Sequence, residues 1–283
     1  MDATSTAYIN GKFLPLSEVS ISPLDRGFVF GDGIYEVIPV YGGQAFRLDA
    51  HLQRLGNSLK AIRLANPCSH KQWCTLLNQL IKKNQSEDQS LYLQVTRGVA
   101  DRDHAFPATC AATVFAMSKP LPPSQQSPVK AITLEDIRWQ WCHIKSTALL
   151  GNLLLRQQAV DVGCHEAILL RNDTLTEGAA SNVFIVKHNK IITPKKSNHI
   201  LPGITREIVI EIAEKNHLDI AETNISQQEL LNADEIWLTS ATKEVAPVIE
   251  LNGKLVSNGQ TGPLCQHMQD LFNQFKKTLS SNS

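Results

Sequence analysis

Apolar residues in the N-terminal part of the chain recur with two different periods, and each period predicts its own kind of element. Intervals of three and four residues over 49–62 and 71–83 are typical of helices that bury one face. Asp49 is expected to cap the first of these helices. Shorter apolar runs that end at turn residues predict strands, with hairpin turns at Asn10-Gly11 and Gly42-Gly43. We expect these strands within residues 7–14, 34–41, 45–48, 90–96 and 111–116.

The same two periods continue through the C-terminal part of the chain. Ser226 and Glu229 have the spacing of a capping box, and Asn252-Gly253 is typical of a hairpin turn. Helices are expected over residues 147–162, 203–216 and 264–278. Strands are expected over residues 129–134, 166–170, 182–186, 235–239 and 245–250. Helices and strands mixed in this way predict an α+β or mixed α/β fold.

One segment differs from the rest in composition. Residues 118–128 contain four prolines in eleven positions and little that could pack in a core. Because proline lacks a backbone donor and restrains its neighbours, this composition is typical of an extended linker. The sequence therefore predicts an N-terminal α/β domain at residues 1–117 and a larger C-terminal domain at residues 129–283.

The overall composition is that of an ordinary globular protein. Hydrophobic residues make up 42% and charged residues 19% of the 283 positions. The 27 basic residues balance the 27 acidic ones, so no net charge favours nucleic acid or a membrane surface. No stretch reaches the roughly 18 apolar residues that a membrane span requires. A small molecule bound in a pocket is the expected ligand.

The cysteines indicate the redox environment. The six cysteines are scattered, with no CxxC pair and no cluster at metal-ligand spacing, so no metal site is predicted. Scattered single thiols are typical of a reducing cytosol. Residues 1–11 contain no basic segment followed by an apolar run, so no signal peptide is expected. We therefore expect a cytoplasmic protein.

Two residues are candidates for amine and proton chemistry. Lys145 has small or apolar neighbours, and removal from water would make its amine nucleophilic. By itself, however, the local pattern favours a lysine that extends to solvent from a strand end. Glu177 falls in a Gly- and Ser-rich turn before a strand, where its carboxylate could accept a hydrogen bond from a ring nitrogen. The alternative is an exposed loop glutamate.

Three places could hold an anion such as a phosphate. The expected helix start at Ile204 and Thr205 offers backbone N–H groups and a hydroxyl, although Thr205 could be an ordinary cap. Ser240 and Ala241 follow a strand and open a small polar turn, which is a second possible cradle. Arg54 could supply a cation, or could be a solvated surface residue.

A charged loop after a strand could bind a carboxylate. Arg102 and His104 are two positions apart, so both side chains would point the same way in an extended loop. A solvated charged loop is the alternative. A histidine metal site is excluded because no second histidine or cysteine lies close in sequence to His104.

The order of these motifs carries more information than any one of them. The chain resembles the fold-type IV pyridoxal-phosphate (PLP) enzymes over nearly its whole length. This group contains D-amino acid, branched-chain and (R)-amine transaminases and aminodeoxychorismate lyases. The motifs that carry the resemblance are Asp25-Arg-Gly-Phe-Val-Phe-Gly-Asp-Gly-Ile-Tyr-Glu36, His51-Leu-Gln-Arg54, Ile144-Lys145-Ser146, Thr176-Glu177-Gly178, Ser181-Asn-Val-Phe184 and Gly203-Ile-Thr-Arg206.

The resemblance implies a role for each candidate. It implies a two-domain fold in which Lys145 holds PLP as a Schiff base and moves the substrate proton. Glu177 would face the pyridine nitrogen and favour its protonated state, so that the ring acts as an electron sink. The phosphate would meet Arg54 and the groups at Ile204, Thr205, Ser240 and Ala241. Arg138 is expected near the cofactor or the tyrosine.

Within the group, the chain is most similar to the D-amino acid transaminases. Arg102 and His104 match the carboxylate trap of that subgroup and, by resemblance, would reach in from the partner of a homodimer. Tyr35 matches the tyrosine that completes the trap. The implied reaction moves the amino group of a D-amino acid, D-alanine in type, to 2-oxoglutarate by a ping-pong mechanism. Ala180 and Ala241 depart from the hydroxyl residues often found at these positions, which puts side-chain contacts there in doubt.

Other readings stay open at this point. An aminodeoxychorismate lyase, an (R)-amine transaminase or a branched-chain transaminase would have the same fold. A non-catalytic PLP-binding protein would keep the fold without the chemistry, and the presence of both Lys145 and Glu177 argues against it.

Overall fold

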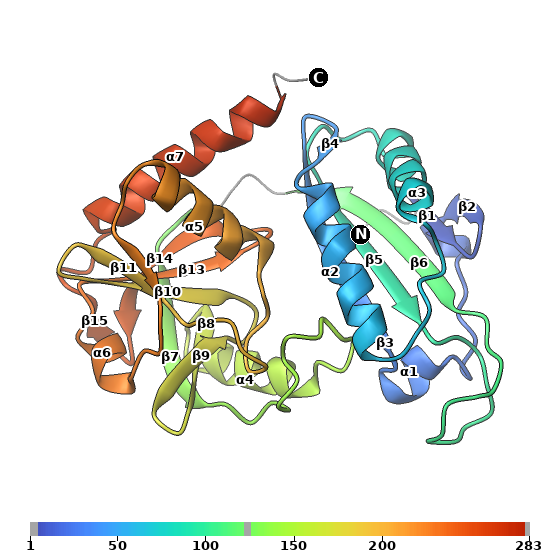
Figure 1. The fold of residues 1–283 in the computed structure, drawn as a ribbon, viewed down its shortest axis with the longest axis horizontal. Helices are drawn as coiled ribbons and strands as arrows, with labels where there is room; N and C mark the ends of the chain where they lie inside the picture. Colours follow the sequence, from blue (N-terminus) through green and yellow to red (C-terminus); the bar gives the residue numbers. More distant parts are fainter. Residues whose placement is uncertain (1–4, 122–125, 281–283) are drawn as a thin grey trace. The chain divides into compact units, whose positions relative to one another are not determined.

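The computed structural model describes residues 5–121 and 126–280, and the chain forms two compact units. Unit 1 consists of Met1–Pro122 together with Ile144–Ala148, and unit 2 consists of Pro123–His143 and Leu149–Ser283. The helices and strands of each unit are labelled in Figure 1.

Unit 1 is built on one antiparallel sheet. Its strands are β1 (Thr6–Ile9), β2 (Lys12–Pro15), β3 (Gly33–Tyr41), β4 (Gln44–Ala45), β5 (Gln89–Thr96) and β6 (Thr113–Pro120). Their order across the sheet is β2-β1-β6-β5-β3-β4. The helical segments are η1 (Leu16–Glu18), α1 (Arg26–Phe30), α2 (Leu48–Ala61) and α3 (His70–Lys83).

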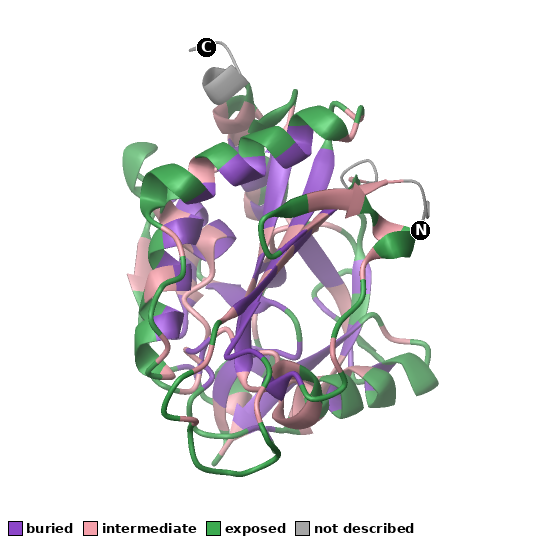
Figure 2. Ribbon diagram, turned by 90° about the vertical axis from the view of Figure 1, so that its right-hand side faces the viewer, coloured by how far each residue is buried: buried purple, intermediate pink, exposed green. Residues whose placement is uncertain are grey.

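The core of unit 1 lies between the sheet and helices α2 and α3. Alternate residues of β3 point to this side, and Ile34 and Ile38 are fully buried there. The helices contribute residues spaced by three and four, among them Leu55, Leu59 and Trp73. In Figure 2, long stretches of the strands are coloured as buried, while the helices carry buried and exposed residues side by side.

Unit 2 contains a larger mixed sheet. Its strands are β7 (Val129–Glu135), β8 (Glu166–Arg171), β9 (Thr174–Gly178), β10 (Asn182–Lys187), β11 (Lys190–Thr193), β12 (Ile220–Glu222), β13 (Glu235–Ser240), β14 (Glu244–Leu251) and β15 (Lys254–Leu255). The order is β12-β11-β10-β13-β14-β7-β8-β9, and β15 pairs with β14. The parallel pairs are β7 with β8, β14 with β7, and β11 with β12.

Four helices belong to unit 2: α4 (Leu150–Asp161), α5 (Ile204–Lys215), α6 (Gln227–Leu231) and α7 (Pro263–Ser280). Helices α5 and α7 contact β13, and α4 contacts β8. In β13, Ile236 and Leu238 enter one apolar cluster, while Trp237 on the other face meets Phe184. No helix within residues 5–121 and 126–280 is both long and apolar enough to cross a membrane.

Most of the predicted elements are present, with shifted ends. The hairpins at Asn10-Gly11, Gly42-Gly43 and Asn252-Gly253 are confirmed, and so is the capping box at Ser226. The prediction that Asp49 caps its helix is wrong. Helix α2 begins at Leu48 after Arg47, whose φ of 52° is left-handed, so Asp49 lies in the first turn. Its negative charge still favours the positive end of the helix.

Glu177 is not in a turn, as its Gly- and Ser-rich surroundings suggested. It lies in β9, which pairs with β8 through a two-residue turn at Asn172 and Asp173. Both turn residues have positive φ, 50° and 55°, which is the conformation that a tight hairpin requires. The Asn-Asp pair was therefore the sequence signal for this hairpin. Strands β9, β11 and β12 were not predicted from the sequence.

Two predicted boundaries need comment. Ser118, Lys119 and Pro120 of the predicted linker are the end of β6, while residues 122–125 of it lie outside the described residues. The helix expected from residue 147 begins at Leu150, because residues 144–148 pack in unit 1. That residues 1–117 and 129–283 form separate domains that fold independently stays a prediction.

Candidate active site

Lys145 lies in the short segment 144–148 that joins the edge of the unit 1 sheet. Tyr35 N donates to Lys145 O at 3.0 Å, and Lys145 N donates to Ser58 Oγ at 3.3 Å. The segment thus contacts both β3 and α2. The Lys145 side chain is half-buried, and its Nζ lies 4.1 Å from the centre of the Tyr35 ring. The two predicted residues Lys145 and Tyr35 are therefore neighbours.

Arg54 is buried and held by a carboxylate, so it is not a solvated surface arginine. Its Nε and Nη2 donate to the two carboxylate oxygens of Glu36, each at 2.7 Å. His51 Nδ1 lies 2.8 Å from Glu36 Oε2. Glu36 comes from the core side of β3, and His51 and Arg54 come from the buried face of α2. The bidentate pair fixes the plane of the guanidinium.

The charges in this triad act on one another. Burial raises the pKa of Glu36, but the Arg54 guanidinium and the His51 hydrogen bond outweigh it and hold that pKa at about 2. Burial lowers the pKa of His51, and the positive charges of Arg54 and Lys145 act in the same direction. Glu36 is therefore ionised over the physiological range, and His51 favours its neutral form.

Arg102 and His104 are both exposed, and both lie against one ring. The Arg102 guanidinium is 5.2 Å from the centre of the Phe30 ring, and the His104 and Phe30 rings are 5.5 Å apart. The expectation that the two side chains point the same way agrees with this shared contact. A carboxylate that reached the ring of Phe30 would meet two cationic or hydrogen-bonding side chains.

The loop that carries this pair is tied to the body of unit 1 on both sides. Arg26 Nη1 donates to the carbonyl of Asp103 at 2.6 Å and to that of Ala105 at 3.3 Å. The ring of Phe106 lies over the guanidinium of Arg97 at 3.7 Å. Both arginines bind the carboxylate of Asp32, at 2.8 and 2.7 Å. The loop is exposed but anchored.

Glu177 is buried in unit 2 and surrounded by donors. Arg138 Nη1 donates to its Oε1 at 2.6 Å, while Asn182 Nδ2 and Leu201 N donate to its Oε2 at 3.1 and 2.9 Å. Asp136 in turn holds Arg138 at 2.9 Å. The interpretation of Glu177 as an exposed loop residue is therefore wrong, and Arg138, expected near the cofactor or the tyrosine, contacts Glu177 directly.

Burial dominates the acidity of Glu177. Removal from water raises its pKa to about 7, while the Arg138 charge and the Leu201 N–H oppose that rise. A carboxylate can accept about four hydrogen bonds, and three donors are in place here. One acceptor position therefore remains for a further donor.

The start of α5 differs from an ordinary capped helix. Gly203 is the N-cap residue and has no side-chain cap, so Thr205 is not a cap. A Cβ at Gly203 would lie 2.0 Å from Asn182 Oδ1, so only glycine allows this approach. Uncapped N–H groups at the start of a twelve-residue helix suit an anion.

The end of β13 lies beside the same asparagine. Thr239 pairs with Asn182 across the strands β13 and β10. Its Oγ1 is buried and has no hydrogen-bond partner among the described residues. Ser240 Oγ accepts from the Lys243 N–H at 3.2 Å, and Ala241 begins the turn that follows. Thr239, which the sequence did not single out, is thus a polar group left without a partner.

The structure groups the candidates within each unit. Lys145 and Tyr35 meet in unit 1, and Arg102 and His104 meet at Phe30. In unit 2, Asn182 touches Glu177 and the start of α5. Sequence reasoning missed the residues that hold the candidates, which are Glu36, His51, Asp136 and Asn182, and it did not single out the unpartnered Thr239. Glu36 and His51 lie within the motifs that carry the family resemblance, and the strand and helix periods place both on the core side.

The chain is similar to known aminotransferases over nearly its whole length. A D-alanine aminotransferase from Bacillus licheniformis is 42% identical over 263 residues, covering 92% of this chain and 93% of that protein. One from Staphylococcus haemolyticus is 39% identical, with 97% and 99% covered. A branched-chain aminotransferase from Thermoproteus uzoniensis has a TM-score of 0.89 at 25% identity, with 95% and 93% covered. The model of amino-transferase class IV matches residues 33–251, and the chain belongs to that family.

Proposed function

We propose that this chain is a D-amino acid transaminase that moves the amino group of D-alanine or a similar D-amino acid to 2-oxoglutarate. The observation that carries the proposal is the identity of about 40% with D-alanine aminotransferases over nearly the full length of both chains. The fold alone does not distinguish a D-amino acid transaminase from a branched-chain one, because a branched-chain aminotransferase shares it. The Arg102 and His104 pair at Phe30 supports the D-amino acid reading.

The cofactor of the proposed reaction is PLP, and the residues present fit it. Glu177 has an acceptor position left for the N–H of a pyridine ring, in a buried place where a charged hydrogen bond is strong. The uncapped start of α5 and the unpartnered Thr239 hydroxyl suit a phosphate. When bound, PLP supplies an electron sink for the electrons that remain when the α-proton of an amino acid leaves.

Lys145 and Glu177 have separate tasks in this proposal. Lys145 Nζ would hold the cofactor and, when displaced by substrate, would take the proton from the substrate α-carbon and return it later. Tyr35 lies against the amine and limits where it can move. Glu177 would keep a ring nitrogen protonated, and the Arg138 charge favours the ionised carboxylate against the opposing effect of burial on the Glu177 pKa.

The phosphate would be held by groups of three kinds. Arg54, fixed by Glu36, would supply the positive charge. Backbone N–H groups at Ile204 and Thr205 would add hydrogen bonds, as would the groups at Ser240 and Ala241. Because residue 241 is alanine, only its N–H could contribute, so the hydroxyl at the end of β13 must come from Ser240 or Thr239.

Arg102, His104 and Tyr35 would bind the substrate carboxylate. In this proposal the chain forms a homodimer in which Arg102 and His104 of one subunit serve the active site of the other. Analytical ultracentrifugation would test whether the homodimer forms.

A cytoplasmic location is proposed on the six free thiols and is tested by cell fractionation.

A substrate panel tests the proposed function. The purified protein is given D- and L-alanine, D- and L-valine, an (R)-amine and aminodeoxychorismate, each with 2-oxoglutarate where an acceptor is needed. Chiral chromatography shows which compound disappears. We expect loss of D-alanine with matching formation of pyruvate and glutamate. Consumption of L-valine alone would support a branched-chain transaminase, and conversion of aminodeoxychorismate without an acceptor would support a lyase.

A further inference from the structure

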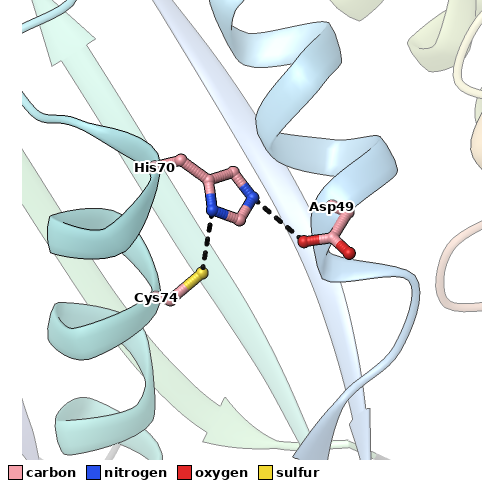
Figure 3. A group of neighbouring side chains, drawn as sticks. All are labelled: Asp49, His70 and Cys74. Carbon is pink, nitrogen blue, oxygen red and sulfur yellow. Dashed lines mark hydrogen bonds and ion pairs between the residues drawn. The ribbon is translucent and has the colours of Figure 1, made fainter.

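Three reactive side chains meet on the surface of unit 1, and none of them is among the residues proposed for transamination. Asp49 lies in the first turn of α2, while His70 and Cys74 lie one turn apart at the start of α3. His70 Nε2 is 2.9 Å from Asp49 Oδ1, and His70 Nδ1 is 3.6 Å from Cys74 Sγ (Figure 3). The imidazole therefore has a carboxylate at one nitrogen and a thiol at the other.

Asp49 determines which nitrogen of His70 can bind a cation. An ionised carboxylate only accepts hydrogen bonds, so Nε2 carries the hydrogen and donates it. In the neutral ring, Nδ1 then has its lone pair directed to the side of Cys74. A carboxylate on one ring nitrogen and a metal on the other is the usual surrounding of a metal-binding histidine.

The spacing of His70 and Cys74 fits a tetrahedral zinc ion. With Zn–N of about 2.0–2.1 Å and Zn–S of about 2.3 Å at a tetrahedral angle, the nitrogen and sulfur lie about 3.6 Å apart. The distance between Nδ1 and Sγ is 3.6 Å. Residues four apart on a helix share one face, so His70 and Cys74 lie on the same side of α3.

Cys74 would bind a metal ion as its thiolate. The S–H bond breaks as the metal–sulfur bond forms, and the proton passes to solvent.

We propose that His70 Nδ1 and Cys74 Sγ bind one Zn²⁺ ion, with Asp49 orienting His70 and water completing the coordination. The side chains of Asp49 and His70 are 88% and 60% exposed, so an ion can enter from solvent. The sequence predicted no metal site because only the spacing of the cysteines and the surroundings of His104 were considered. The signal was His70 and Cys74 at four residues on a helix, with Asp49 21 positions earlier.

Cobalt(II) tests the proposal in the intact, PLP-loaded enzyme. Thiol-reduced, chelator-treated protein is titrated with Co²⁺, and absorption is followed in the red part of the visible spectrum, beyond that of a yellow chromophore. We expect tetrahedral cobalt bands that saturate at one ion per chain and disappear when Zn²⁺ is added. Cys74→Ser and His70→Ala should each abolish these bands. Cys68→Ser, which removes another half-buried thiol close to α3, is the matched control and should leave them unchanged.

A second variant tests the part played by Asp49. Asp49→Asn should keep the cobalt bands but weaken affinity by about 10- to 100-fold, as loss of an orienting partner does. Transaminase activity and the circular dichroism spectrum serve as folding checks for every variant. Bands that persist in Cys74→Ser, or a Co²⁺ affinity that is the same in His70→Ala as in the wild type, would overturn the proposal.

Discussion

At the scale of single residues, the candidates differ in what holds them. Arg54, Glu177 and Arg138 are buried and paired, whereas Arg102 and His104 are exposed and rest on an aromatic ring. Buried charges must have partners because removal from water is costly. Each buried candidate therefore depends on a residue that takes no direct part in chemistry.

Replacement of Lys145 by alanine should abolish transamination and leave the protein folded. The Lys145 backbone makes the contacts that join the segment to β3 and α2, so these contacts survive the loss of the side chain. The measurement is steady-state turnover of D-alanine, with circular dichroism as the check on folding. Lys130→Ala, at an exposed lysine paired with Glu250, is the control and should retain full activity. Sustained turnover in Lys145→Ala would contradict the role given to this amine.

Glu177 should leave a pH signature in stability. Its pKa is raised from 4.5 to about 7 by burial, so between these values the folded state binds more protons than the unfolded state. Its contribution to the free energy of unfolding is therefore present below pH 4.5 and is lost as pH rises to about 7. We expect cofactor-free wild type to lose stability relative to Glu177→Gln over this range in urea unfolding. A stability difference between wild type and Glu177→Gln that stays constant with pH would show that burial does not dominate the pKa of Glu177.

At the scale of elements, the site depends on how strands and helices present the candidates. β3 gives Glu36 to the core and Tyr35 to the opposite face, because neighbouring residues of a strand alternate. α2 gives His51 and Arg54 to the same side, because residues three apart share a face. One strand and one helix therefore carry four of the residues around the proposed phosphate and amine.

Glu36→Gln should destabilise unit 1 strongly. The change leaves Arg54 buried with a neutral partner, and breaking a buried ion pair by removing one member costs about 3–5 kcal/mol. The free energy of unfolding in urea should fall by about this amount at neutral pH. Glu18→Gln, at an exposed glutamate of η1, should change stability little. Wild-type stability in Glu36→Gln would mean that Arg54 does not need this carboxylate.

The anchored loop gives a graded pair of predictions for substrate binding. Arg102→Ala should raise KM for D-alanine about tenfold or more, since it removes a charged hydrogen bond to the carboxylate. Phe106→Ala removes the ring stacked on Arg97 and should raise KM about two- to fivefold, with kcat nearly unchanged. Asp101→Asn in the same loop is the control. Equal effects of Arg102→Ala and Phe106→Ala, or a loss of kcat alone, would contradict the idea that Phe106 anchors the loop that carries Arg102.

At the scale of the whole molecule, the sequence predicted elements better than their grouping. Helices α2, α3, α5 and α7 were found because a buried stripe repeats every three or four residues. The short strands β11 and β12 were missed because three or four residues show no period. Partners of the candidates that lie far away in the sequence, such as Glu36 for Arg54, were missed because long-range pairing leaves no local pattern.

The membership of residues 144–148 in unit 1 can be measured by hydrogen exchange. The amides of Lys145 and Thr147 donate to Ser58 and Gly33, so their protection should follow the stability of unit 1. Leu59→Ala in the unit 1 core, which costs about 2–5 kcal/mol, should speed their exchange. Leu238→Ala, a matched change in the unit 2 core, should speed it much less. The reverse order would assign the segment to unit 2.

This segment also has a consequence for how the protein is made. A ribosome releases residues 1–122 first, but unit 1 is not complete until Ala148 has followed. At synthesis rates of about 5–20 residues per second, the segment that completes unit 1 follows residue 122 after roughly 1–5 seconds. That segment contains Lys145. The chain thus finishes its first folded body with the residue proposed for catalysis, after β7 of the next body has already been synthesised.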